Sequence, residues 1–442
     1  MTAAISRFFE LEERNTNVRT ELAAGLTTFM TMAYIIFVQP QVLGAAGMDK
    51  GAVLVATCLS SALACFLMGI LANYPIAQAP LMGENFFFAY TVILGMGIPW
   101  EKALGLVFLS GVLFLALTLT QVREMIVNSV PEGLKYGIAV GIGFFVTLIG
   151  LKEAGVVVFT EAAPKLGPVT SLPVALSLAG FTLMAVLTAR RVKGAVLIGI
   201  LATGVAAWAC GLVVYEGLVS APPSLSPTFL KFDLAGLWRW EYLSLIIVFL
   251  YMTLFDTVGT LLGVSIQADL LKDGKLPRAS RALMADAVAT TVGACLGTST
   301  VSSYIESSTG VRVGGRTGLT AVTVGGLFLA ALFAFPLVRM ISGGVEIAGG
   351  HMIHPITAPA LILVGAFMVE GLRRIDWKDF TESMPAFLTI VCIPFTFSIA
   401  EGIAIGFISY PILKAAAGRP RDASPLVWVM ATLFVLRYVF LD

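Results

Sequence analysis

The chain has 442 residues, of which 58% are hydrophobic and 12% are charged, and its net charge at neutral pH is +1. A soluble domain carries about 25% charged residues, so this composition indicates a chain whose surface faces mostly lipid. The small net charge argues against nucleic acid as the partner, because binding a polyanion needs a basic face. The five cysteines lie in apolar stretches without metal-ligand spacing, which favours buried, unpaired thiols.

Residues 1–19 are charged and lack the short apolar core and the cleavage site of a signal peptide, so we expect a cytoplasmic N-terminal segment. Its apolar residues Ile5, Phe8, Phe9 and Leu11 favour one face of a short interfacial helix. Beyond it, runs of about 20 apolar residues predict membrane-spanning helices. In chain order these runs are 20–43, 51–73, 101–122, 133–151, 172–188, 194–217, 241–265, 282–297, 319–341, 355–371, 383–398, 400–417 and 424–441.

Two further segments, 78–97 and 299–318, are long enough to cross the membrane but are interrupted by polar residues and glycines, and each holds an acid. If both cross and 424–441 is an appended helix, the chain has 14 spans. With a cytoplasmic N-terminus, most Lys and Arg residues then fall on the cytoplasmic side. The interrupted segments become spans three and ten, so equivalent helices of the two halves run in opposite directions. Paired broken spans are typical of an inverted-repeat secondary transporter with a site near mid-membrane.

Four acids lie inside predicted spans rather than in loops: Glu84, Asp256, Asp286 and Glu306. An ionisable group at this depth costs roughly 2.5 kcal/mol or more, so each needs a partner, a proton or a functional role. For a single acid, a structural pairing is the alternative explanation, although the less favoured one. Four acids gathered around two broken spans favour a functional site. The sequence offers no basic residue at the same depth that could pair with Asp256. Because an unpaired acid there favours the protonated form, Asp256 suits proton coupling.

Three motifs carry little weight. The glycines of GVRVGGRTG lack the Gly-Lys-Ser/Thr ending of a phosphate loop. His351 and His354 have a three-residue spacing but lie in a predicted external loop without a further metal ligand. Ser302 and Ser303 have no histidine base nearby in the sequence, so nucleophilic catalysis has no support. We therefore expect no cofactor, no metal and no enzymatic activity.

Several long blocks resemble one family. FDTVGTLLGV (255–264), DGKLPRASRALMADAV (273–288) and GTSTVSSYIESSTGVRVGGRTGLTAV (297–322) resemble the azaguanine-type purine permeases. These are nucleobase–cation symporters built on the uracil-permease fold. Residues 27–49 and 379–410 are similar to the same permeases, so the resemblance covers nearly the whole chain.

The resemblance implies an all-α polytopic membrane protein of two inverted seven-span repeats, in which spans three and ten are a short strand followed by a half-helix. It also implies a core domain that moves against a gate domain, as in an elevator. The core would comprise 20–125 (spans one to four) and 241–342 (spans eight to eleven), and the gate 126–218 (spans five to seven) and 355–417 (spans twelve to fourteen), with 418–442 as an appended hydrophobic helix.

For the site, the resemblance implies a purine base held between the crossed strands and taken up with protons. The family's acids of spans eight and ten match Asp256 and Glu306, which are expected at the base, and its span-nine acid matches Asp286, expected in proton coupling together with Asp256. Thr260 lies one helical turn after Asp256 and should share its face, and Asn85 is kept in the span-three strand. A carboxylate accepts two adjacent N–H groups of a purine, which explains acids at such a site.

The chain departs from these permeases at two places. The usual GMGLNAFF is LMGENFFF here, which introduces Glu84 and Phe86, and the usual Asn-Pro of span one is Gln39-Pro40. Glu84 has two interpretations that the sequence leaves open. It approaches Glu306, carries a proton and donates to the purine, or it faces away and bonds span-one groups such as Gln39.

The main alternative is an anion or other small-solute transporter of the same fold, which would favour a neutral or basic site and is disfavoured by the acids. We expect a multi-pass protein of the cell inner membrane that contacts lipid and has a cytoplasmic N-terminus. The preferred purine and the presence of a homodimer are left open by the sequence.

Overall fold

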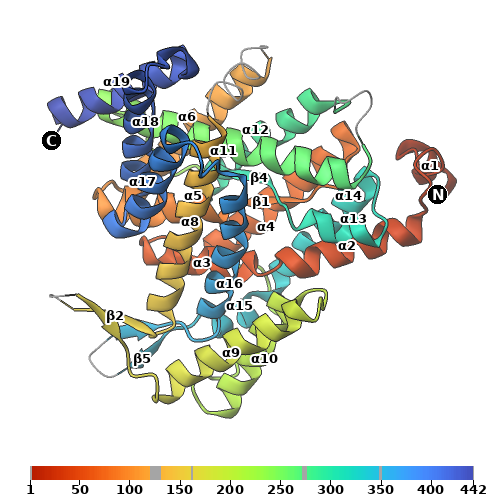
Figure 1. Ribbon diagram of the computed structural model, residues 1–442. Helices are drawn as coiled ribbons and strands as arrows, with labels where there is room; N and C mark the ends of the chain where they lie inside the picture. Colours follow the sequence, from red (N-terminus) through yellow and green to blue (C-terminus); the bar gives the residue numbers. More distant parts are fainter. Residues whose placement is uncertain (1, 120–130, 161–162, 271–275, 348–350, 442) are drawn as a thin grey trace.

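The computed structural model describes residues 2–119, 131–160, 163–270, 276–347 and 351–441, and all structural statements refer to these residues. Helices dominate, and the strands are short pairs inserted between them (Figure 1). The first half of the chain contains α1 (Thr2–Phe8), α2 (Val18–Met32), α3 (Ile35–Ala45), α4 (Lys50–Leu67), β1 (Gln78–Pro80), α5 (Met82–Phe86), α6 (Trp100–Leu119), α8 (Glu132–Glu153), β2 (Val157–Phe159), β3 (Pro164–Leu166), α9 (Leu172–Ala189) and α10 (Ala195–Ala209). Helices α4 and α5 continue as wider π-helical turns over Met68–Ala72 and Phe87–Gly95.

The second half begins with the longest helix of the described chain, α11, which runs without a break past Asp256. Its elements are α11 (Trp240–Gln267), α12 (Ala279–Leu296), β4 (Val301–Ser303), α13 (Ser307–Val313), α14 (Gly318–Ala331), α15 (Phe335–Ile341), β5 (Val345–Ile347), β6 (His351–Ile353), α16 (Ala358–Met368), α17 (Phe380–Thr396), α18 (Ile399–Ala416) and α19 (Pro425–Leu441).

Local sequence signals explain where several helices begin. Asn17, Asp49 and Asp379 each accept a backbone N–H of the first turn of α2, α4 and α17, and the Ser398 hydroxyl does so for α18. These side chains satisfy donors that a helix leaves unpaired at its N-terminus. Gly297 ends α12 with a φ of 102°, a left-handed conformation that favours glycine.

Eight helices of the described chain are long and apolar enough to cross a membrane. They are Val18–Ala45, Lys50–Ala72, Trp100–Leu119, Glu132–Glu153, Leu172–Ala189, Tyr242–Gln267, Gly318–Ile341 and Ile399–Ala416. Shorter apolar helices at Ala195–Ala209, Phe380–Thr396 and Pro425–Leu436 match further predicted spans. The segments predicted to be interrupted are β1 with α5 and β4 with α13, each a short strand followed by a helix. The predicted fold class is therefore confirmed.

Two details differ from the sequence-based expectation. Span one is divided into α2 and α3 at Ala33 and Tyr34, although the run 20–43 is continuously apolar. Two small hairpin sheets, β2 with β3 and β5 with β6, connect spans where only loops were expected. Hydropathy reports the surrounding solvent and carries little information on such local pairing.

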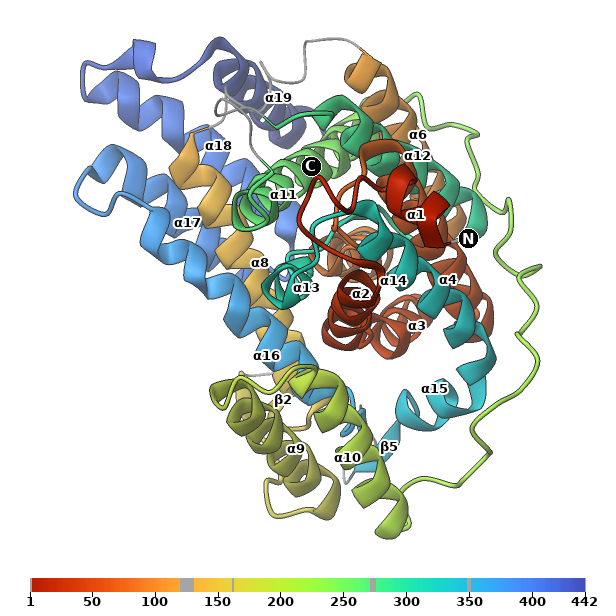
Figure 2. The same cartoon turned by 90° about the vertical axis from the view of Figure 1, so that its right-hand side faces the viewer.

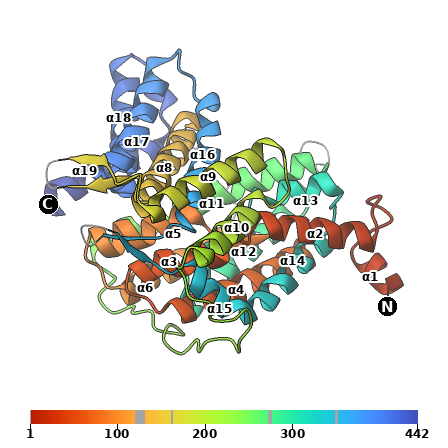
Figure 3. The ribbon, with the colours of Figure 1, turned by 90° about the horizontal axis from the view of Figure 1, so that it is seen from below.

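Glycines allow neighbouring helices to pack closely. A Cβ at Gly137 of α8 would lie 3.1 Å from Ala386 Cα of α17, and a Cβ at Gly318 would lie 2.0 Å from the Gly69 carbonyl oxygen. Helix α8 packs against α16 and α17, whereas α14 packs against α2 and α4, and α12 against α4 and α6. The helices α8 and α16–α18 accordingly lie on one side of the molecule, and α2, α4, α12 and α14 on the other (Figures 2 and 3).

Candidate functional site

The two interrupted spans meet through their strands. β1 and β4 pair antiparallel, with Gln78 opposite Ser303, Ala79 opposite Ser302 and Pro80 opposite Val301. The pairing extends at both ends, because Leu81 N–H donates to the Thr300 carbonyl at 3.1 Å and Tyr304 N–H donates to the Ala77 carbonyl at 2.9 Å. All six strand residues are buried. Protein atoms thus satisfy this non-helical backbone, as its depth in a membrane requires.

Helix α11 passes beside the strands with one polar stripe. Thr253, Asp256, Thr257 and Thr260 follow the spacing that places residues on one helix face, as predicted for Asp256 and Thr260. The Thr257 and Ser302 hydroxyls form a short hydrogen bond that ties this stripe to β4.

Asp256 lies on an exposed part of α11. Asp256 and Gly259 are exposed, Ile305 is 52% exposed, and a Cβ at Gly259 would meet no atom within 4 Å. In contrast, the preceding part of α11, from Leu245 to Leu254, is almost entirely buried. The exposed part of α11 therefore lies toward the C-terminal end of the helix, which the predicted topology places on the cytoplasmic side.

Glu306 lies just before α13 and is partly buried. Its Oε1 atom accepts a hydrogen bond from the Tyr34 hydroxyl at 3.1 Å. Tyr34 stands at the break between α2 and α3 and is buried. The break in span one thus places a phenol against the acid of span ten.

Glu84, at the start of α5, is only 2% exposed. Its Oε2 atom accepts the Thr253 hydroxyl at 3.2 Å, and its Oε1 atom has no hydrogen-bond partner among the described residues. Within these residues, no hydrogen bond joins Glu84 to Gln39 or to Glu306, the two partners that the sequence suggested. Glu84 instead contacts the polar stripe of α11, one turn before Asp256.

Asn85 and Gln39 form a separate buried cluster. The Gln39 amide donates to Asn85 Oδ1 at 3.2 Å and to the Thr298 hydroxyl at 3.1 Å, and the Ser299 hydroxyl also bonds Asn85 Oδ1. Asn85 therefore uses its carbonyl oxygen to join span one to the segment before β4. A role for Asn85 in binding a substrate stays a prediction.

Asp286 on α12 is fully buried. It accepts the Ser302 hydroxyl at 3.1 Å and the Ser303 hydroxyl at 3.3 Å. Because Ser302 also bonds Thr257, a chain of hydroxyl groups connects Asp286 to α11 beside Asp256. The predicted role of Asp286 in proton coupling stays a prediction, as does substrate binding by Thr260.

Sequence reasoning missed four side chains around these acids. Thr253 and Thr257 could have been found from their helical spacing to Asp256. Ser302 was considered only as a nucleophile, and its actual neighbours are an acid and a threonine. Tyr34 gave no local signal, because it approaches Glu306 across 272 positions of the chain.

The arrangement can bind a ligand that presents N–H groups. Carboxylate oxygens accept such donors strongly where water is scarce. No group of three or more His, Cys, Asp or Glu side chains suited to a metal occurs within the described residues. His354, considered above as a metal ligand, has its Nδ1 atom 2.6 Å from Glu153 Oε2, away from this cluster.

Known proteins resemble the chain over nearly its whole length. The permease family matches residues 19–405. An adenine permease of Escherichia coli is 47% identical over 440 residues, covering 99% of this chain and 96% of the relative. A guanine/hypoxanthine permease of Bacillus subtilis is 44% identical over 447 residues, covering 98% and 99%.

The transmembrane domain of a cyanobacterial bicarbonate transporter superposes with a TM-score of 0.64 over 88% of this chain and 97% of that domain. At 12% sequence identity, this likeness concerns the fold alone. The matches to the adenine and guanine/hypoxanthine permeases concern the sequence as well as the fold, and they include both interrupted spans. The chain therefore belongs to the permease family, as a multi-pass membrane transporter and not an enzyme, and its resemblance to the azaguanine-type nucleobase permeases is confirmed.

Proposed function

We propose that this protein takes up purine nucleobases (adenine, guanine, hypoxanthine or xanthine) together with protons. The observation that carries the proposal is the gathering of Glu84, Asp256 and Glu306 around two paired strands inside the membrane-spanning part. The adenine and guanine/hypoxanthine permeases among its relatives support a purine as the ligand. A carboxylate site suits the N–H edge of a purine and opposes an anionic solute.

We assign base recognition to Asp256 and Glu306. Asp256 is exposed on α11, so a ligand that approaches this face of the helix reaches its carboxylate directly. The Tyr34 hydroxyl occupies one oxygen of Glu306 and orients the carboxylate, so that the second oxygen is available to a ligand N–H. Thr260, Asn85 and Glu84 complete the proposed set of binding residues.

We assign proton coupling to Asp256 and Asp286. An acid that alternates between a protonated and a charged state needs an accessible side chain in at least one conformation, and Asp256 is exposed. Asp286 lies behind β4, joined to α11 by the hydroxyls of Ser302 and Thr257. This buried chain of hydroxyl groups couples the carboxyl group of Asp286 to the face of α11 that carries Asp256.

The proposed movement is an elevator motion of the core (20–125 and 241–342) against the gate (126–218 and 355–417). It is supported by the close packing of α8 with α16 and α17 within one proposed unit and of α14 with α2 and α4 within the other. The two proposed units meet where Phe86 of α5 lies edge-on to Phe145 of α8, with ring centroids 6.4 Å apart. Polar contacts also cross this boundary, since the Thr357 hydroxyl donates to Gln41 Oε1 and Arg339 pairs with Glu216, and the proposed movement has to break them.

We further propose a location in the cell inner membrane with the N-terminus in the cytoplasm. The N-terminal segment contacts two basic regions that the positive-inside rule assigns to that side. Arg278 Nη2 lies 2.7 Å from Glu10 Oε1, and Arg14 donates to the Arg316 carbonyl at 3.3 Å.

Uptake into proteoliposomes tests the proposal. With an imposed pH gradient, the wild-type protein should accumulate labelled purine, and Asp256→Asn should abolish accumulation. The matched control is Asp269→Asn, because Asp269 is an exposed residue just past the end of α11. Purine uptake near the wild-type rate by Asp256→Asn, or uptake of bicarbonate in place of purine, would contradict the proposal.

A further inference from the structure

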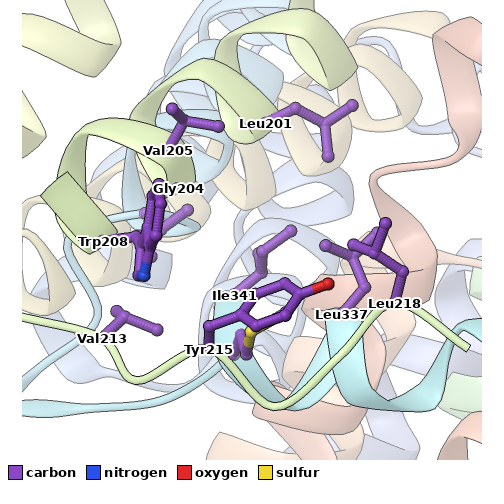
Figure 4. Close-up of a pocket in the computed structure, with 11 residues that line it drawn as sticks. Leu201, Gly204, Val205, Trp208, Val213, Tyr215, Leu218, Leu337 and Ile341 are labelled. Carbon is purple, nitrogen blue, oxygen red and sulfur yellow. The ribbon is translucent and has the colours of Figure 1, made fainter.

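An apolar crevice of about 470 Å³ lies between α10 and α15, away from the site described above. Leu201, Val205 and Trp208 of α10 form one wall, and Leu337 and Ile341 of α15 face them, with Tyr215 at the edge (Figure 4). The lining side chains are aliphatic or aromatic apart from one methionine. Val205 is 62% exposed and Trp208 is 56% exposed, so the crevice opens to the surface.

A second, charged pocket of about 650 Å³ adjoins this crevice. The two share Val213 and Met340 in their walls. The charged pocket is lined by two cations, Lys50 and Arg339, and by two carboxylates, Asp49 and Glu216. Arg339 Nε lies 3.3 Å from Glu216 Oε2, and both side chains are partly exposed. An apolar crevice thus leads directly to a charged mouth whose formal charges cancel.

The position of the crevice and the charged pocket in the fold indicates that both face lipid. Lys50 begins α4, Glu216 follows α10 and Arg339 lies near the end of α15, which the predicted topology places together at the external membrane surface. Trp208 and Tyr215 have the amphipathic rings that gather at the lipid–water interface. Long apolar walls below a charged rim match the shape and chemistry of a phospholipid.

We propose that the crevice and the charged pocket together bind one phospholipid with a zwitterionic amine head group, such as phosphatidylethanolamine. One acyl chain lies between α10 and α15. The lipid phosphate contacts Lys50 and Arg339, and the lipid ammonium contacts Asp49 and Glu216. An anionic lipid fits less well, because its head group offers no cation to the two carboxylates.

Native mass spectrometry of the purified protein tests the site, with phosphatidylethanolamine and phosphatidylglycerol added at equal concentrations. We expect one retained phosphatidylethanolamine per chain and at least tenfold weaker retention of phosphatidylglycerol. Gly204→Leu should reduce phosphatidylethanolamine retention at least tenfold by filling the crevice. A Cβ at Gly204 meets Ile341 and Ile356 only at 3.6 and 3.8 Å, which are ordinary van der Waals contacts.

The matched control is Gly326→Leu on the exposed face of α14, where a Cβ meets no atom within 4 Å. Val205→Trp fills the crevice from its exposed side and replaces Gly204→Leu should that variant fold poorly. For the head group, Lys50→Gln combined with Arg339→Gln should also weaken retention at least tenfold, whereas Lys231→Gln, at an exposed position between α10 and α11, should not.

Three outcomes would overturn the proposal. One is unchanged phosphatidylethanolamine retention in folded Gly204→Leu and Val205→Trp. Another is equal retention of phosphatidylglycerol. The third is a dimer of the wild-type protein that Gly204→Leu converts to monomers, because a second copy of the chain would then cover the crevice. None of these measurements depends on purine transport.

Discussion

Replacing Glu84 by leucine tests whether the Glu84 carboxyl group binds the base or has only a structural role. Leucine is the residue that the resembling permeases carry at this position. The Thr253 hydroxyl, which donates to Glu84 Oε2 at 3.2 Å, also lies 2.9 Å from the Phe249 carbonyl. The substitution therefore leaves no buried donor without an acceptor.

The expected effect follows from the surroundings of the two oxygens. If Glu84 binds the base, Glu84→Leu loses a hydrogen bond worth about 1.5–3 kcal/mol, which raises Kd by about tenfold to a hundredfold. The unliganded protein should at the same time become more stable. Oε1 is buried without a partner among the described residues, and such an atom costs about 1–3 kcal/mol.

The measurement is calorimetric titration with adenine, guanine, hypoxanthine and xanthine at several pH values, together with the unfolding midpoint in the same detergent. Glu370→Leu is the control, since Glu370 is exposed after α16. We expect Glu84→Leu to change the order of preference among the four bases or to shift the pH optimum, and to raise the midpoint. Unaltered affinities and pH dependence would reduce Glu84 to a structural residue and refute the reasoning.

Three further predictions concern other acids and one buried cation. Asp286→Asn should leave purine binding largely intact while uncoupling uptake from the pH gradient; joint loss of binding and coupling in paired binding and uptake assays would disprove the separation of roles. Glu306→Gln should weaken purine binding by about 2–3 kcal/mol, and an unchanged Kd by calorimetry would remove Glu306 from the site. Lys414 is 1% exposed with its Nζ atom 2.7 Å from Glu382 Oε1, so Lys414→Met should lower the unfolding free energy by about 3 kcal/mol, which denaturant unfolding can check.

The membrane-spanning plan could be predicted from the sequence because it depends on local chemistry. Runs of apolar residues indicate the segments that lie in lipid, and the basic loops between them indicate which side of the membrane each loop faces. The polar interruptions at 78–97 and 299–318 predicted the strands and half-helices. Irregular backbone at that depth occurs only where protein or a water-filled cavity satisfies its polar groups. The positions of Asp256 and Glu306 within spans could also be predicted, because each acid lies inside a segment that the hydropathy assigns to the membrane.

The partners of these acids required the tertiary structure. Glu84 and Thr253 are 169 positions apart, and Tyr34 and Glu306 are 272 positions apart, so neither pair leaves a periodic signal in the chain. The sequence offered Gln39 as a partner for Glu84, yet packing brings Gln39 to Asn85 instead.

The crevice between α10 and α15 likewise has no sequence signature, because each wall alone resembles an ordinary lipid-facing helix. The sequence by itself determined which segments enter the membrane and which acids enter with them, because burial in lipid constrains each residue separately. Only the tertiary structure decided which side chains meet there, because contacts depend on how all helices pack at once.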